Sequence, residues 1–177
     1  MLNKTLSRRE LGLGAAVLAL AACTKAGTTA QAAEGSTKGA MEKKMSENID
    51  WANLTDSQWK ARLTDQEYKV LRHEATDRPF TYALLENKET GIYDCAGCEL
   101  PLFESETKFD SRTGWPSFWQ NIDGSLGTKE DRKLFSLRTE MHCSRCKGHI
   151  GHIFNDGPAP TGKRFCANGS ALHFRKA

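Results

Sequence analysis

The sequence predicts a mainly β domain of antiparallel strands that begins with two short helices. From Phe80 onward, short runs of alternating or β-branched residues are separated by Gly, Pro, Asn and Asp, which is typical of antiparallel strands and their turns. The region before Phe80 instead carries two helix-start patterns. Two Cys-x-x-Cys motifs in the β region indicate a metal that joins two hairpins. With 177 residues, the chain has room for one domain with a core.

The first 23 residues have the architecture of an export signal. A basic start precedes an apolar run of small residues that is too short to span a bilayer as a stable helix. The segment Ser7–Leu11 (SRREL) resembles a twin-arginine signal, and Leu20–Cys23 (LAAC) resembles a bacterial lipobox. The alternatives are a chance arginine pair and ordinary cleavage after residues 30–32. We therefore expect an exported protein of the bacterial periplasm or envelope, held at a membrane only through a lipid on Cys23.

The export signal is followed by a linker and then by the folded domain. Residues 24–50 are mostly Thr, Lys, Ala, Gly, Ser and Glu, which bury too little apolar surface to fold. We expect a flexible linker there and one domain over residues 51–177. The whole chain has a net charge of +3, and without residues 1–23 it has 22 basic and 21 acidic residues, a net charge of +1. This balance argues against a nucleic-acid partner.

Two capping boxes predict the helices. Thr55 and Thr64 are each followed three residues later by Gln or Glu, which predicts helices over 55–62 and 65–75. Arg78-Pro79 ends the second helical region. The alternating and β-branched patterns that follow predict strands over 91–95, 134–142, 150–154 and 170–175.

Four cysteines form a candidate metal site. The two motifs together provide a tetrahedral four-thiolate set for one zinc ion: Cys95, Cys98, Cys143 and Cys146. Such a set leaves no open coordination position, which indicates a structural role. The 44 residues over 99–142 exceed the spacing of a compact zinc ribbon, so the metal would join two distant hairpins. Two disulfides, or one redox-active motif beside an unrelated pair, are the alternatives.

Cys166 is the one thiol of the domain that the metal site leaves over. It lies between Arg164 on one side and the short amide Asn168 on the other. Positive charge favours the thiolate, which is the form that attacks an electrophile. The alternative is that Cys166 is a small buried hydrophobe.

Several motifs resemble those of the B-type methionine sulfoxide reductases, which act on the R epimer. They occur in the order of that family over about residues 51–177, together with both Cys-x-x-Cys motifs: Gly114–Phe118 (GWPSF), Gly148–Phe154 (GHIGHIF), Asp156–Pro158 (DGP) and Arg164–Asn168 (RFCAN). The resemblance implies two antiparallel β-sheets with helices at the N-terminal side. It also implies that Cys166 attacks the sulfoxide sulfur of methionine sulfoxide in peptides or proteins.

The chemistry of the expected reaction calls for further residues around Cys166. A sulfoxide oxygen leaves only when it gains a proton, and His149 and His152 are the available donors. The products would be methionine and a sulfenic acid on Cys166. By resemblance, Trp115 would face the substrate S-methyl group, Asn168 would hydrogen-bond within the site, and Arg164 would favour the thiolate. Each residue has an alternative role. Trp115 would be a core aromatic residue, and His149 and His152 would be structural histidines. Asn168 would be a turn residue and Arg164 a surface charge.

The sequence departs from a common pattern of that family. Many members carry a resolving cysteine just before the Gly-Trp-Pro segment, whereas residues 99–142 contain none and Asp110–Thr113 occupy that stretch. We therefore expect a one-cysteine cycle in which an external thioredoxin-like protein reduces the sulfenic acid. Two other functions stay open: a protein-binding zinc-knuckle module, and a thiol-disulfide oxidoreductase with one metal-free Cys-x-x-Cys.

Overall fold

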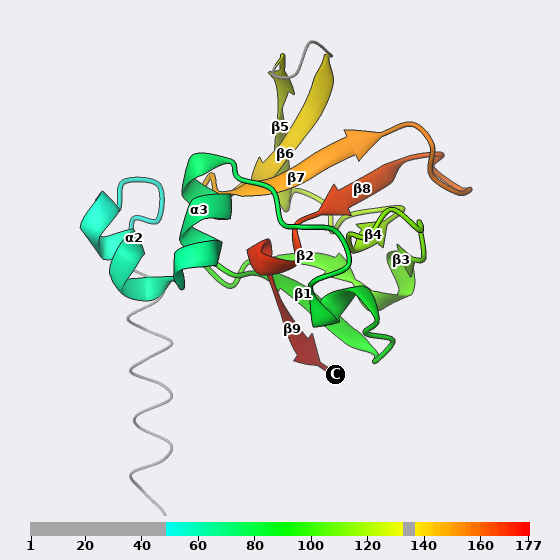
Figure 1. The fold of residues 1–177 in the computed structure, drawn as a ribbon, viewed down its shortest axis with the longest axis horizontal. Coiled ribbons are helices and arrows are strands. Elements are labelled where there is room, and N and C mark those ends of the chain that lie inside the picture. The colour runs from blue at the N-terminus through cyan, green and yellow to red at the C-terminus, as the bar shows by residue number, and fades with distance from the viewer. Residues whose placement is uncertain (1–48, 133–136) are drawn as a thin grey trace, which may run out of the picture. The chain divides into compact units, whose positions relative to one another are not determined.

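The computed structural model describes residues 49–132 and 137–177 (Figure 1). The predicted export signal, with Arg8, Arg9 and Cys23, lies outside the described residues, as does the predicted linker up to residue 48. Within the described residues, no helix has the length and apolar character needed to cross a membrane.

Two capped helices open the domain. Helix α2 (Asp56–Arg62) has Thr55 as its N-cap and α3 (Asp65–His73) has Thr64, and both capping boxes are complete. Acidic residues in the first turn and basic residues in the last turn complement the dipole of each helix. The predicted helices are confirmed, although α3 ends at His73 rather than at residue 75. It ends there because Glu74 adopts a left-handed conformation with φ of 54°.

The strands of the described residues form two antiparallel sheets (Figure 1), which confirms the predicted fold class. The smaller sheet has the order β2-β1-β9, and the larger sheet has the order β3-β4-β8-β7-β6-β5. In chain order the strands are β1 (Gly91–Cys95), β2 (Pro101–Glu104), β3 (Lys108–Phe109), β4 (Ser117–Phe118), β5 (Leu126–Asp131), β6 (Arg138–Cys143), β7 (His149–Phe154), β8 (Arg164–Ala167) and β9 (Leu172–Lys176).

The predicted strands agree with these elements to within a few residues. Strand β1 has the predicted bounds, and β7 begins one residue earlier than predicted. The strand predicted over 170–175 begins at Leu172, because Gly169–Ala171 form a 3-10 turn. The strand predicted over 134–142 corresponds to β6, and residues 134–136 of that prediction lie outside the described residues.

Aromatic side chains join the two sheets. Phe103 of β2 and Phe118 of β4 stack with ring centroids 4.1 Å apart and planes inclined by 7°. Tyr93 of β1 meets Phe118 edge-on, with centroids 5.0 Å apart. All three are fully buried, and offset and edge-on pairs of this kind stabilise a core beyond the burial of their area. The larger sheet, which carries the site, is therefore anchored on the smaller one at β4.

Candidate active site and metal centre

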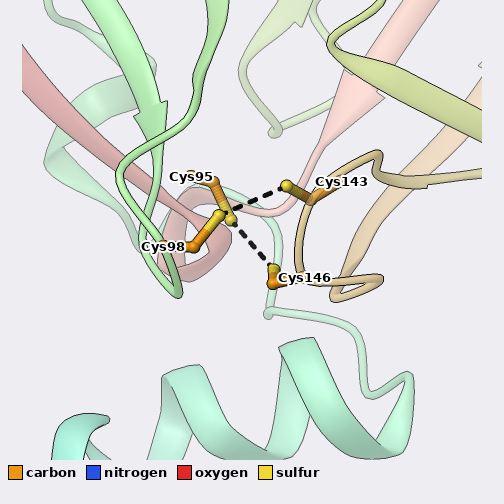
Figure 2. A group of neighbouring side chains, drawn as sticks. All are labelled: Cys95, Cys98, Cys143 and Cys146. Carbon is orange, nitrogen blue, oxygen red and sulfur yellow. Dashed lines mark hydrogen bonds between the residues drawn. The ribbon is translucent and has the colours of Figure 1, made fainter. Parts of the chain in front are cut away.

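The four cysteines of the two motifs come together between two hairpins (Figure 2). Cys95 and Cys98 lie at the turn between β1 and β2, and Cys143 and Cys146 lie at the turn between β6 and β7. The sulfur of Cys95 is 3.7 Å from that of Cys146, and the sulfur of Cys98 is 3.5 Å from that of Cys143. Disulfide sulfurs would be about 2.05 Å apart, so these pairs are not disulfides.

The spacing of the sulfurs fits a zinc ion. A tetrahedral site with zinc–sulfur bonds of about 2.3 Å requires sulfurs about 3.8 Å apart. All four sulfurs lie within 4.8 Å of one another, and all four residues are buried. The neighbouring thiols, that of Cys146 first, lower the pKa of Cys143, and a metal binds the thiolate form. The donor set therefore fits the structural metal predicted from the sequence.

Helix α3 supports both turns of this cysteine cluster. Arg72 Nη1 donates to the carbonyl of Cys146 at 3.0 Å, and Arg145 Nη1 reaches across to the carbonyl of Cys98 at 3.0 Å. Leu71 of α3 packs against Gly97 and Gly148, and a Cβ added at Gly148 would lie 3.0 Å from its Cδ2. The residue that follows Gly148 is His149, so the cluster also fixes the start of β7.

Cys166 lies in the middle of the larger sheet, on β8. Its register partners are Ser117 on β4 and His152 on β7. The residue is partly exposed and lines a cavity of about 120 Å³. The other lining residues are Thr76, Trp115, Arg138, Gly151, His152, Phe154, Ala167 and Asn168. Three of the predicted site residues, Trp115, His152 and Asn168, therefore share this cavity with the thiol.

Gly151 sits directly against the strand that carries Cys166. A Cβ added at Gly151 would lie 2.0 Å from the carbonyl oxygen of Cys166, which is a severe clash. Only glycine allows β7 and β8 to approach this closely, and this explains the glycine inside the GHIGHIF motif.

Two opposing influences act on the Cys166 thiol. Burial raises its pKa, and this increase is larger than the decrease caused by the charge of Arg164. The nearby side chains of Thr113 and Ser117 also lower the pKa. Arg164 is held by Asp156 through two hydrogen bonds of 2.9 and 2.8 Å. Arg164 thus acts in the expected direction, but the net pKa of Cys166 lies above its ordinary value.

Trp115 and Asn168 are both anchored on the main chain of Asp77. The indole Nε1 of Trp115 donates to the Asp77 carbonyl at 3.0 Å, and the Asp77 N–H donates to Asn168 Oδ1 at 2.9 Å. Asn168 Nδ2 donates in turn to the carbonyl of Ile150 at 3.1 Å. Two walls of the cavity are therefore fixed to one residue that the sequence analysis did not select.

The two predicted histidines occupy different environments. His152 lines the cavity, and its Nε2 lies 2.8 Å from Asp131 Oδ2. His149 is 3% exposed and does not line the cavity. Its Nδ1 lies 3.1 Å from Glu140 Oε1, but within the described part of the chain neither ring nitrogen makes an aligned hydrogen bond. Burial lowers the pKa of His149, which favours its neutral form.

A break in the strand register places both histidine rings on one side. Met141 lies opposite Gly151 while His142 lies opposite His149, so β7 has one extra residue here. An extra residue of this kind reverses the alternation of side chains along a strand. The two rings are consequently neighbours, with centroids 5.4 Å apart.

Comparison with known proteins agrees with this arrangement. The SelR domain matches residues 63–176, which include the cysteine cluster and the cavity. A protein of Hahella chejuensis named "Peptide methionine sulfoxide reductase MsrB" is 46% identical over 130 residues, covering 73% of this chain and 94% of that protein. A protein of Methanosarcina barkeri with the same name is 51% identical over 122 residues, covering 68% of this chain and 86% of that protein.

This chain belongs to the SelR family, the B-type methionine sulfoxide reductases. It is therefore an enzyme of the oxidoreductase class. Among solved structures, the Mis18 Yippee-like domain is 15% identical with a TM-score of 0.42, covering 50% of this chain and 98% of that chain. A likeness this low supports no conclusion about the reductase.

Several residues that support the reductase site were not predicted from the sequence. Asp77 anchors Trp115 and Asn168, Asp131 contacts His152, and Thr113 and Ser117 lower the pKa of the Cys166 thiol. Two of them had a sequence signal: Ser117 lies inside the GWPSF motif, and Thr113 directly precedes it. The others depend on contacts between distant segments, which no local pattern reveals.

Proposed function

We propose that the enzyme reduces the R epimer of methionine sulfoxide in peptides or proteins through Cys166. One observation carries the proposal: a partly exposed thiol shares a small cavity with an aromatic ring, Trp115, and a titratable ring, His152. A sulfoxide side chain has an apolar methyl group and a polar oxygen on the same sulfur atom. The indole suits the methyl group, and the imidazole suits the oxygen.

In the proposed reaction, the sulfur of Cys166 attacks the sulfoxide sulfur as a thiolate. His152 donates a proton to the sulfoxide oxygen, which would otherwise be a poor leaving group. The S–S bond formed in the attack then breaks as the protonated oxygen moves to the Cys166 sulfur, so the thiol is oxidised to a sulfenic acid while the sulfoxide is reduced to a thioether. The proton that leaves the thiol balances the proton gained by the oxygen, so the net change is the transfer of one oxygen atom.

The remaining residues have supporting roles in this proposal. Asn168 and Trp115 shape the cavity from their common anchor at Asp77. Arg164 favours the thiolate once substrate excludes water from the thiol. His149 lies behind His152 and supports its ring rather than meeting the substrate. A structural zinc ion on Cys95, Cys98, Cys143 and Cys146 would hold the turn that precedes β7.

Recycling of Cys166 is proposed to require another protein. Thr113 directly precedes the Gly-Trp-Pro segment and lowers the pKa of the Cys166 thiol, but its hydroxyl cannot form a disulfide. The other described cysteines belong to the buried cluster. A thioredoxin-like protein would therefore attack the sulfenic acid and form a mixed disulfide with Cys166.

The site of action is proposed to be the bacterial envelope. The twin-arginine-like segment with Arg8 and Arg9 would direct export, and Cys23 would carry a lipid. An exported enzyme of this kind would repair oxidised envelope proteins. Fractionation tests this part separately: Cys23→Ser should move the protein from the membrane fraction to the soluble fraction.

The catalytic proposal is tested with peptides that carry the separated R and S epimers of methionine sulfoxide. With dithiothreitol as the reductant, the wild type should reduce the R epimer, and Cys166→Ser should be inactive. Cys23→Ser is the matched control, because it removes a thiol outside the domain and should keep full activity. Activity on the S epimer alone, or activity that survives Cys166→Ser, would contradict the proposed function.

A further inference from the structure

The carboxylate of Asp131 is held between a histidine and an arginine. Its Oδ2 lies 2.8 Å from Nε2 of His152 and 2.6 Å from Nη2 of Arg138. Asp131 ends β5 and is the register partner of Arg138, the first residue of β6. The side chain of Asp131 is 7% exposed and that of His152 is 14% exposed, so water competes little for these contacts.

This contact selects the proton-bearing nitrogen of His152. An ionised carboxylate only accepts hydrogen bonds, so Nε2 of His152 must carry the proton that points to Asp131. Nδ1 is then the ring nitrogen that remains to exchange a proton with a substrate.

Arg138 holds Asp131 in place for this contact. Because both contacts use Oδ2, a rotation of the carboxylate away from His152 would also break the ion pair with Arg138. Arg138 itself lines the cavity that contains Cys166. The histidine, the carboxylate and the guanidinium therefore form one unit at the edge of the cavity, called here the His152–Asp131–Arg138 unit.

The neighbouring histidine provides a contrast. Glu140 lies near His149, yet it is also paired with Lys129 at 3.2 Å, and its contact with His149 is poorly aligned. Burial favours the neutral form of His149, and His149 does not line the cavity. Of these two neighbouring pairs, only that of Asp131 and His152 combines an aligned contact with access to the thiol.

We propose that Asp131, held by Arg138, is a positioning residue that fixes the orientation and the tautomer of His152 as proton donor. The proposal rests on the proposed function, because it concerns the proton given to the sulfoxide oxygen. Asp131 does not line the cavity and acts through His152. A purely structural aspartate would contribute to stability but would leave the tautomer of His152 unchanged.

The experiment measures the tautomer and the chemical step in the same proteins. Nitrogen-15 NMR of the reduced, metal-loaded enzyme assigns the His152 ring by comparison with His152→Gln and reports which nitrogen is protonated. Rapid-quench single turnovers with an R-sulfoxide peptide give the rate of methionine formation without any contribution from recycling. The variants are Asp131→Asn and Arg138→Met, and the exposed Asp123→Asn is the matched control.

The wild type and Asp123→Asn should show His152 protonated at Nε2. In Asp131→Asn this tautomer should be lost, and the single-turnover rate should fall about 10- to 100-fold, because a general acid contributes about 10²- to 10⁴-fold. Arg138→Met should show a smaller loss in both measurements. If Asp131→Asn does not fold, Arg138→Met and the wild-type spectrum decide the question.

Two results would overturn the inference: a wild-type His152 protonated at Nδ1 alone, or variants with wild-type spectra and rates within about twofold of the control. The spectra do not depend on whether the proposed function holds, whereas the rates can be compared only if the wild type reduces the R epimer. Failure of the proposed function appears instead as a wild type that does not reduce the R epimer, whatever the tautomer of His152.

Discussion

The indole Nε1 of Trp115 donates a hydrogen bond of 3.0 Å to the main-chain carbonyl of Asp77. The side chain of Asp77 is itself buried, and its two oxygens accept from Gln66 Nε2 at 2.9 Å and from the N–H and hydroxyl of Ser170 at 2.8 Å each. The wall of the cavity is thus held by a network that also involves α3 and the turn before β9.

Asp77→Ala should therefore destabilise the domain and weaken substrate binding. The change leaves the buried donors of Ser170 and the half-buried amide of Gln66 without their acceptor, which should lower the free energy of unfolding by about 2–4 kcal/mol. Looser anchoring of Trp115 should raise KM. Urea unfolding and steady-state kinetics measure the two effects, with the exposed Asp123→Ala as the control. A loss of stability no larger than that of the control would refute the role of this network.

The metal prediction concerns the buried cysteine cluster. The wild type and Cys166→Ser should each bind one zinc ion per chain, whereas Cys98→Ser should lose it, because its sulfur is one of the four ligands. Removal of the metal by a strong chelator should lower the free energy of unfolding by more than about 3 kcal/mol. Metal analysis and thermal unfolding provide the measurements. Zinc-free protein with four oxidised thiols would instead support a disulfide role.

Thr113→Cys should convert the one-cysteine cycle into a two-cysteine cycle. The Thr113 side chain lies close enough to the Cys166 thiol to lower its pKa, so a sulfur placed there should attack the sulfenic acid and release water. After one turnover without reductant, mass spectrometry should find a disulfide between residues 113 and 166. The wild type should retain a trappable sulfenic acid, as should Thr128→Cys, whose new thiol is exposed on β5. An intramolecular disulfide of Cys166 in the wild type would refute the one-cysteine cycle.

The pH dependence of Cys166 follows from its raised pKa. Because burial keeps the thiol protonated at pH values where an exposed thiol has already ionised, its alkylation should require a more alkaline pH. Arg164→Met removes a charge that lowers this pKa, so the profile should move further to the alkaline side. Lys163→Met removes the charge of an exposed neighbour and should have little effect. Iodoacetamide labelling of Cys166 over a pH series measures the profile of the wild type and of each variant.

Local patterns in the sequence predicted the elements that local interactions determine. The capping boxes at Thr55 and Thr64 are formed by residues three positions apart, so the helices could be placed closely. The two Cys-x-x-Cys motifs predicted a common site because their chemistry requires four ligands. Both predictions needed little knowledge of how distant parts of the chain meet.

The arrangement of the histidines could not be predicted in this way. In a regular strand, residues three positions apart point to opposite faces, so His149 and His152 would have been separated. Their proximity depends on the extra residue of β7 opposite Met141 and His142, which is a property of strand pairing. The contact between Asp131 and His152 likewise requires β5, β6 and β7 to be in register.

The cysteine cluster has a consequence for how the chain folds. Its closest cross-hairpin pair, Cys98 and Cys143, is separated by 45 positions, so the cluster cannot close on the ribosome until the turn before β7 has emerged. Until then, each Cys-x-x-Cys pair is a free dithiol that can be oxidised. Closing so long a loop also costs conformational entropy. A chain that folds in an oxidising compartment would risk the wrong pairing of these thiols. Because the cluster closes late, we expect reducing conditions during synthesis to raise the yield of native enzyme.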